Sequence, residues 1–200
     1  MQIIRDIDQL QPEWFSLRLA SIGSTAINKI APGGVGFTDT LYEFAGEAIT
    51  GVPADSFKFQ HADRGHEFEP QARRDYEFIT DNVVEQITMI QGEPRQHVST
   101  DGIIGEDGIL EIKTRIPKIF IKILKGKLTE PIADRRQRDW GLHVSGRKWV
   151  DSVNYCPEIA KAGRGGILIK RFYRDEEKIL ELKTVADKFL KDLDELLGKI

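Results

Sequence analysis

The stretch that decides the fold runs Ser99-Thr100-Asp101-Gly102-Ile103-Ile104, then Gly105-Glu106-Asp107-Gly108, then Ile109-Leu110-Glu111-Ile112-Lys113. The middle segment consists of turn-forming residues, and the segments on both sides are rich in β-branched and apolar residues. We therefore predict a hairpin, in which a strand over residues 97–104 and a strand over residues 109–113 run antiparallel.

The hairpin brings charged side chains together on one face. In a strand, residues two apart share a face, so Glu111 and Lys113 point to one side and the apolar residues that alternate with them point to the other. Asp101 lies across the turn. A turn of three or five residues places Asp101 opposite Glu111, whereas a turn of four residues places it one position out of register. In that second case, a bulge at Gly102 would restore the pairing. The sequence is compatible with both arrangements.

This combination of residues suits metal-assisted chemistry. Two carboxylates that converge on one point form a hard oxygen site for Mg²⁺ or Mn²⁺. Phosphodiester hydrolysis uses such a site, because the metal polarises the phosphoryl oxygen and activates the attacking water. Lys113 beside the metal can orient that water and stabilise the developing negative charge. The alternative is a structural ion pair between Glu111 and Lys113 on a half-exposed strand.

A third carboxylate comes from a charged helix predicted over residues 63–78. Gly65 and Glu69 lie one above the other on such a helix. A glycine there permits close approach to the sheet, and Glu69 then points toward the carboxylates of the hairpin. The alternative is a solvated helix in which Glu69 forms weak pairs with Arg73 or Arg74.

The rest of the chain alternates between helical and extended patterns, and residues 31–36 read as a flexible loop. Helices are predicted near Pro12 and over 41–49, 63–78, 116–124, 133–144 and 175–197; strands are predicted over 83–90, 97–104, 109–113, 148–155 and 166–172. This order favours an α/β fold with one mixed sheet flanked by helices, in a single domain over residues 1–200.

Composition narrows the class of protein further. One cysteine, Cys156, excludes an internal disulfide, and it excludes a zinc knuckle or an iron–sulfur cluster built from this chain's cysteines alone. We find no secretory signal and no apolar run long enough to span a membrane. The net charge is −3, yet residues 113–138 hold 9 basic and 2 acidic side chains, against 8 basic and 19 acidic in residues 1–112. The basic segment is either a solvated helical face or a strip that faces phosphates.

Several motifs, in order, resemble those of the phage-type (lambda-type) alkaline exonucleases and the related YqaJ-type viral recombinases, within the PD-(D/E)XK nuclease superfamily. The resemblance covers nearly the whole length, from about Trp14 to the C-terminal helix. It rests on Trp14-x-x-Leu17-Arg18, Gly65-x-x-x-Glu69-x-x-Ala72-Arg73, Ser99-Thr100-Asp101-Gly102, Leu110-Glu111-Ile112-Lys113, Gln137, Val144-Ser145-Gly146-Arg147-Lys148-Trp149 and Tyr155-x-Pro157.

The resemblance implies a sheet of the restriction-endonuclease type and a toroidal homotrimer around DNA. It implies Mg²⁺-dependent, or Mn²⁺-dependent, 5′→3′ degradation of one strand of linear duplex DNA, with two ions per site. The products would be 5′-mononucleotides and a 3′ overhang for a single-strand annealing protein. The setting would be the cytoplasm of a bacterial host, with a phage or prophage as the source.

Site residues follow from the same motifs. The resemblance implies that Glu69, Asp101, Glu111 and the Ile112 carbonyl bind metal, and that Lys113 is catalytic with support from Gln137. Arg18 and a hydroxyl group of Ser24 or Thr25 would bind the 5′-phosphate. The chain departs from the family pattern at Asp134, where a tyrosine is usual, and at Asp139, where the family has a second glutamine.

Two other functions remain open at this point. One is a PD-(D/E)XK endonuclease of the restriction or repair type, which the Leu17-Arg18 segment disfavours because an endonuclease has no use for a pocket that binds DNA ends. The other is a non-catalytic DNA-binding subunit, which the intact set of Asp101, Glu111 and Lys113 disfavours.

Overall fold

The computed structural model describes residues 1–7, 11–54 and 63–200, with side chains from residue 67 onward in the last range. Its centre is a five-stranded sheet in the order β2-β5-β6-β7-β8. These strands are β2 (Val84–Glu85), β5 (Gly102–Ile104), β6 (Gly108–Thr114), β7 (Trp149–Tyr155) and β8 (Ile167–Tyr173). β6 and β7 pair in parallel and the other neighbours pair antiparallel, so the predicted mixed sheet is confirmed.

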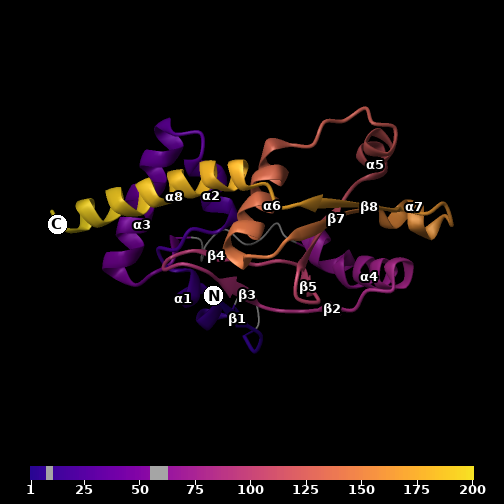
Figure 1. The fold of residues 1–200 in the computed structure, drawn as a ribbon, viewed down its shortest axis with the longest axis horizontal. Helices are drawn as coiled ribbons and strands as arrows, with labels where there is room; N and C mark the ends of the chain where they lie inside the picture. The colour runs from indigo at the N-terminus through magenta and orange to yellow at the C-terminus, as the bar shows by residue number, and fades with distance from the viewer. Residues whose placement is uncertain (8–10, 55–62) are drawn as a thin grey trace.

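Helices cover both faces of this sheet (Figure 1). α4 (Asp63–Thr80) packs on one face, against β6, β7 and β8, and α6 (Ile132–Ser145) packs on the other. Beyond α6 lie α2 (Ser24–Ile30), α3 (Gly34–Thr50) and the long α8 (Glu176–Leu197), which contact one another. The sheet is therefore the middle layer of an α/β sandwich, as the sequence pattern indicates.

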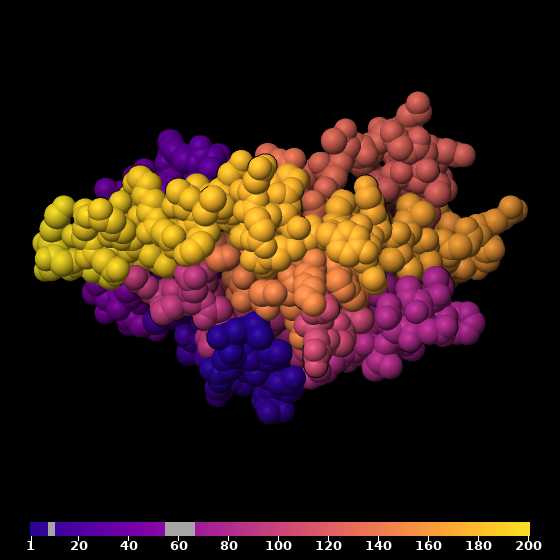
Figure 2. All heavy atoms as spheres, viewed as in Figure 1, coloured from indigo at the N-terminus to yellow at the C-terminus, as the bar shows by residue number. Residues whose placement is uncertain are grey.

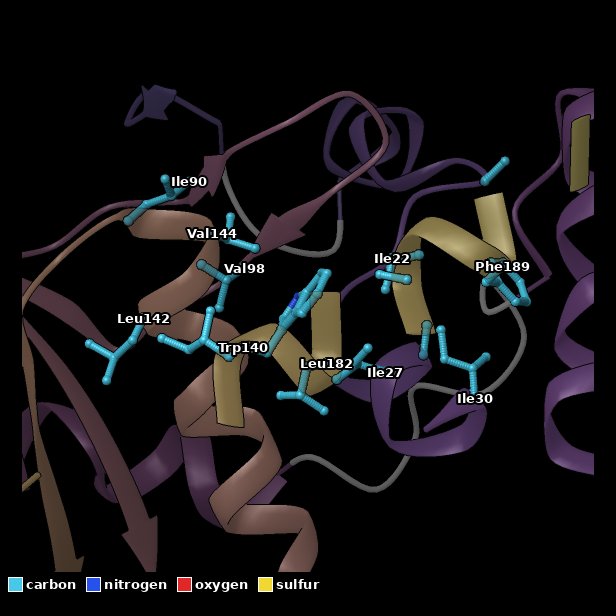
Figure 3. Packing of buried hydrophobic residues seen from close by; sticks show 14 of the residues in the cluster. Ile22, Ile27, Ile30, Ile90, Val98, Trp140, Leu142, Val144, Leu182 and Phe189 are labelled. Carbon is cyan, nitrogen blue, oxygen red and sulfur yellow. The ribbon is translucent and has the colours of Figure 1, made fainter. Parts of the chain in front are cut away.

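The two faces have separate hydrophobic cores. On the α4 side, Tyr76 packs with Leu110, Ile112 and Val153. On the other side, the fully buried indole of Trp140 lies at the centre of a larger cluster formed by α2, α6, α8 and the strands (Figure 3). Because β6 contributes to both cores, its position is fixed from above and below, and so are the charged side chains that it carries.

A second, smaller sheet lies beside the first. It is antiparallel, in the order β1 (Gln2–Ile4), β3 (Met89–Gln91), β4 (His97–Val98). The prediction of single strands over 83–90 and 97–104 was wrong, because each stretch contributes to both sheets. Thr88 turns the first stretch away from the large sheet, since its amide donates to the Ile4 carbonyl at 2.8 Å. The second stretch bends at residues 99–101 before β5 begins.

Most predicted helices are confirmed to within a few residues. They include α1 (Pro12–Arg18), α5 (Pro117–Leu124) and α8, where the side chain of Asp175 caps the first turn. The predicted loop over 31–36 was wrong in its second half, because α3 begins at Gly34. Gly36 lies so close to α2 that a Cβ atom would meet the Lys29 carbonyl oxygen at 2.7 Å, so packing between helices outweighs the low helix propensity of glycine.

Three elements were not predicted, namely β1, α2 and α7 (Pro157–Lys161). The space-filling view shows an elongated body from which the segment around α5 projects (Figure 2). Among the described helices, none combines the length and the apolar character needed to cross a membrane.

Candidate active site

Glu111 and Lys113 lie on the face of β6 that α6 covers. Lys113 Nζ donates to Glu111 Oε1 and to Gln137 Oε1, at 2.8 Å each, and Gln137 Nε2 donates to the same Glu111 oxygen. The neighbouring residues Leu110 and Ile112 are buried in the core on the α4 side. The alternation expected from the sequence is confirmed, and α6 brings Gln137 to the pair.

Asp101 lies opposite Glu111. Ile104 pairs with Gly108, so the hairpin turn has three residues, and continuing this register places Asp101 across from Glu111. The Asp101 side chain accepts a hydrogen bond from the Ile112 amide at 2.5 Å, while its own amide donates to the Leu110 carbonyl at 3.1 Å. The first of the two predicted arrangements is therefore the one that forms.

Glu69 reaches this group from α4 through an arginine. Arg73, one turn further along the helix, forms an ion pair with Glu69 and donates to the Asp101 carbonyl oxygen at 3.2 Å. Arg73 is 7% exposed, so its charge acts inside the cluster rather than in solvent. Of the two predicted partners of Glu69, Arg73 forms the contact and Arg74 is exposed. Gly65, which the sequence places below Glu69, lies outside the residues whose packing is described.

The carboxylates repel one another and are poorly solvated. Burial, and then the charge of Glu69, raise the pKa of Asp101 to about 6. Burial raises the pKa of Glu111 to about 7, although Lys113 opposes the shift. Burial also raises the pKa of Glu69. For Lys113, burial lowers the pKa, but the attraction of Glu111 is stronger in sum and the net pKa is raised. A cation in this field would be strongly stabilised.

By residue type, the group fits a hard divalent cation. Glu69, Asp101 and Glu111 provide carboxylate oxygens, and the pKa of each is influenced by at least one other member of the set. Among the residues described, however, no three acidic, histidine or cysteine side chains converge closely enough to hold an ion as they stand. Glu69 would turn from Arg73, and Glu111 from Lys113, to become ligands.

A polar pocket, called the Arg18 pocket below, lies next to α1 and α2. Arg18, Ser21, Thr25, Lys29 and His97 are among its lining residues, whereas Ser24 is not. The Arg18 guanidinium lies 4.0 Å from the centre of the Trp14 ring. Burial, and then the charge of Arg18, lower the pKa of His97 to about 3, so this histidine is neutral. Two of the three residues that the resemblance implies for phosphate binding therefore share one pocket.

Comparison with known proteins gives the family. Residues 13–148, more than half of the chain, match the family model of the YqaJ-like viral recombinase domain. The chain belongs to the YqaJ-like viral recombinase family. The matched region contains Glu69, Asp101, Glu111, Lys113 and Gln137. No curated protein gives a match.

Solved structures of other proteins share the fold of this chain. An alkaline exonuclease from Laribacter hongkongensis is 24% identical, with a TM-score of 0.83 over 94% of this chain and 95% of that one. Its complex with dAMP gives a TM-score of 0.82 at the same identity and coverage. A phage-related exonuclease from Haemophilus somnus 129PT is 14% identical, with a TM-score of 0.65 over 90% of this chain and 96% of that one. These matches confirm the fold expected from the sequence.

Asp134 and Asp139, where the chain departs from the family pattern, both form ion pairs. Asp134 pairs with Arg115 at 2.7 Å, and Arg115 also donates to Asn154 at 2.8 Å. Asp139 lies 3.7 Å from Arg138 and is 5% exposed. These acidic residues therefore hold arginines of their own chain in place.

From the sequence, Arg73 was predicted only as a partner of Glu69 on a solvated helix, and Arg115 was assigned no role. The spacing of both residues is a signal for their place in the site. Arg73 is one helical turn from Glu69, and Arg115 continues the two-residue spacing of Glu111 and Lys113 along the chain.

Proposed function

We propose that this chain is a metal-dependent exonuclease that degrades one strand of linear duplex DNA in the 5′→3′ direction, releasing 5′-mononucleotides and leaving a 3′ overhang. The observation that carries the proposal is the convergence of Asp101, Glu111, Lys113 and Gln137 in a YqaJ-like fold. The solved relatives, described as exonucleases, support the same class of reaction.

Three carboxylates would hold the metal. Glu69, Asp101 and Glu111, with the Ile112 carbonyl, would bind Mg²⁺ or Mn²⁺, two ions per site in the full arrangement. When bound, the metal supplies Lewis-acid polarisation of the phosphoryl oxygen and a water of lowered pKa. The raised pKa values of Asp101 and Glu111 support this assignment, because a cation lets both carboxylates ionise together.

Lys113 would act on the phosphate itself. Its ammonium group donates to Glu111 and to Gln137 at 2.8 Å each. When Glu111 turns to the metal, Gln137 would still hold the ammonium group before substrate arrives. It remains protonated because its pKa is raised. From this position it can hydrogen-bond to a non-bridging phosphate oxygen and stabilise the charge that develops there. Gln137 keeps the ammonium group aimed and is a positioning residue.

The Arg18 pocket would select the end of the strand. A guanidinium group binds phosphate oxygens in a bidentate manner, and Thr25 adds a hydroxyl donor; Ser24 at the start of α2 is the other candidate. The acidic residues of this pocket are already engaged. Glu43 lies 3.4 Å from Lys29, and Glu47 accepts from two backbone amides. Binding of a terminal 5′-phosphate here would fix the polarity of degradation.

One digestion experiment tests the proposal. Linear and covalently closed circular duplexes are incubated with Mg²⁺ or with EDTA, with 5′-phosphorylated and 5′-hydroxyl ends compared. We expect mononucleotides from linear DNA in Mg²⁺ only, faster from phosphorylated ends, with closed circles spared. Asp101→Ala is the matched inactive control. Nicking of closed circles would favour the endonuclease alternative, and no hydrolysis of any DNA would favour a non-catalytic DNA-binding subunit.

Family resemblance supports two proposals about assembly. We propose a toroidal homotrimer through which the duplex passes, and a single-strand annealing protein as the partner that receives the 3′ overhang. A bacterial cytoplasm, with a phage or prophage as the source of the gene, is the setting in which such a pair of proteins would act.

A further inference from the structure

A cavity separate from the Arg18 pocket lies beside the candidate active site. It has a volume of about 300 Å³, at the lower end of the range for small-molecule sites. Its floor is formed by Ser152 of β7 together with Lys170 and Phe172 of β8, and its outer wall includes Ile123 and Leu128. The wall belongs to the segment that projects from the body in Figure 2. It shares no lining residue with the Arg18 pocket.

The floor of this cavity continues the surface that carries the catalytic pair. In the parallel pairing of β6 with β7, Glu111 is opposite Ser152 and Lys113 is opposite Asn154. Partners in register point to the same face of a sheet. Ser152 is in turn opposite Lys170 on β8, two strands from Glu111 or roughly 10 Å at about 4.8 Å per strand. A DNA strand at the centre therefore has this cavity directly beside it.

The charges around the cavity favour a nucleotide. Its two acidic residues are already paired, Asp134 with Arg115 and Glu130 with Arg138. Within the described part of the chain, Lys170 is an exposed cation with no carboxylate partner. Its Nζ lies 4.6 Å from the centre of the Phe172 ring, and the Arg138 guanidinium lies 3.8 Å from the same centre. An aromatic ring, apolar walls and an available ammonium group together match a base and its phosphate.

We propose that this cavity receives one unpaired nucleotide of the DNA strand next to the bond that is cleaved. The proposal rests on the proposed nuclease function and deepens it. The base contacts Phe172 and the apolar wall, and the phosphate on that nucleotide contacts Lys170. Because the cavity lies between the sheet and the segment after α5, we expect it to admit a base that has left its partner. The occupied cavity would hold the strand as the scissile phosphate meets Lys113.

Abasic substrates test the position and the residues together. Linear duplexes with a 5′-phosphate carry one abasic residue at each of the first few positions in turn. For the wild type, we expect kcat/KM to fall about 5-fold or more at one position only, since stacking of one base contributes about 1–3 kcal/mol. Phe172→Leu and Lys170→Ala should lose most of this dependence on position and cleave the intact duplex more slowly, mainly through KM. Lys191→Ala on α8 removes the same charge elsewhere and should behave as wild type.

A small substrate separates the cavity from the centre. Bis(p-nitrophenyl) phosphate is a phosphodiester without a base, so it engages the catalytic residues alone, and Lys170→Ala should hydrolyse it at the wild-type rate. Equal abasic sensitivity in the wild type and both variants, or equal loss on the ester and on DNA, would overturn the proposal. If the wild type hydrolyses no DNA, the proposed function fails. The cavity is then judged by fluorescence anisotropy with a labelled single-stranded oligonucleotide in EDTA, where unchanged affinity in both variants would overturn it.

Discussion

The Asp101 carboxyl group is held where its charge is disfavoured, so removing that charge should stabilise the protein. Its pKa is raised from 3.8 to about 6, mainly by burial and then by Glu69. The shift is about two pKa units, and at about 1.36 kcal/mol per unit the ionised carboxylate costs the folded state about 3 kcal/mol. Asp101→Asn keeps the shape of the side chain and an oxygen that can accept from the Ile112 amide.

The stabilisation should depend on pH in a defined direction. The pKa of Asp101 is higher in the folded protein than in the unfolded chain. The carboxyl group is therefore protonated at low pH and does not lower the free energy of unfolding there, whereas above about pH 6 its ionisation lowers the free energy of unfolding by the full amount. In EDTA at about pH 8, we expect Asp101→Asn to exceed the wild type by about 3 kcal/mol, with the difference shrinking toward pH 4. Mg²⁺ should stabilise the wild type, by about 2.7 kcal/mol at a 100-fold excess over Kd, and should stabilise the variant less.

Urea denaturation followed by tryptophan fluorescence measures the effect, because Trp140 is fully buried. Equal m-values for the two proteins would show that the free energies of unfolding can be compared. Asp187→Asn is the control, since this residue forms an exposed ion pair with Lys183 and should change stability little. The reasoning is refuted if Asp101→Asn is no more stable than the wild type at about pH 8, or if the difference is the same at every pH.

Three further predictions concern activity and assembly. Lys113→Ala should lower turnover by about 10²-fold with little change in DNA affinity, and a variant that binds DNA poorly but turns over normally once bound would make Lys113 a phosphate-positioning residue instead. Arg18→Ala should remove most of the preference for a 5′-phosphate over a 5′-hydroxyl in competition digests while slow hydrolysis persists; equal slowing on both ends would contradict that role. Light scattering should give the mass of three chains, and a stable monomer at working concentration would count against the ring.

Local patterns predicted that Glu111 and Lys113 share a face of β6, but they did not predict the two sheets around this strand. The alternation of Glu111 and Lys113 with apolar residues needs only the two-residue period of a strand, and α8 needs only its capping residue and apolar stripe. The order of residues could not show that residues 83–90 and 97–104 divide between two sheets, because the division depends on contacts with β1. The Arg73 contacts join α4 to the Asp101 backbone and likewise exist only in three dimensions.

Among the described strands, the chain passes between the two sheets three times, between β1 and β2, between β2 and β3, and between β4 and β5. Asp101 lies in the last of these passages, and Glu111 lies on the strand that both cores hold. Neither sheet can melt alone without pulling on this passage, so the centre has no independent local opening and should be lost only in the global unfolding transition. A nascent or partly folded chain would then have no hydrolytic capacity. Under the proposed function, degradation of DNA would begin only when folding is complete.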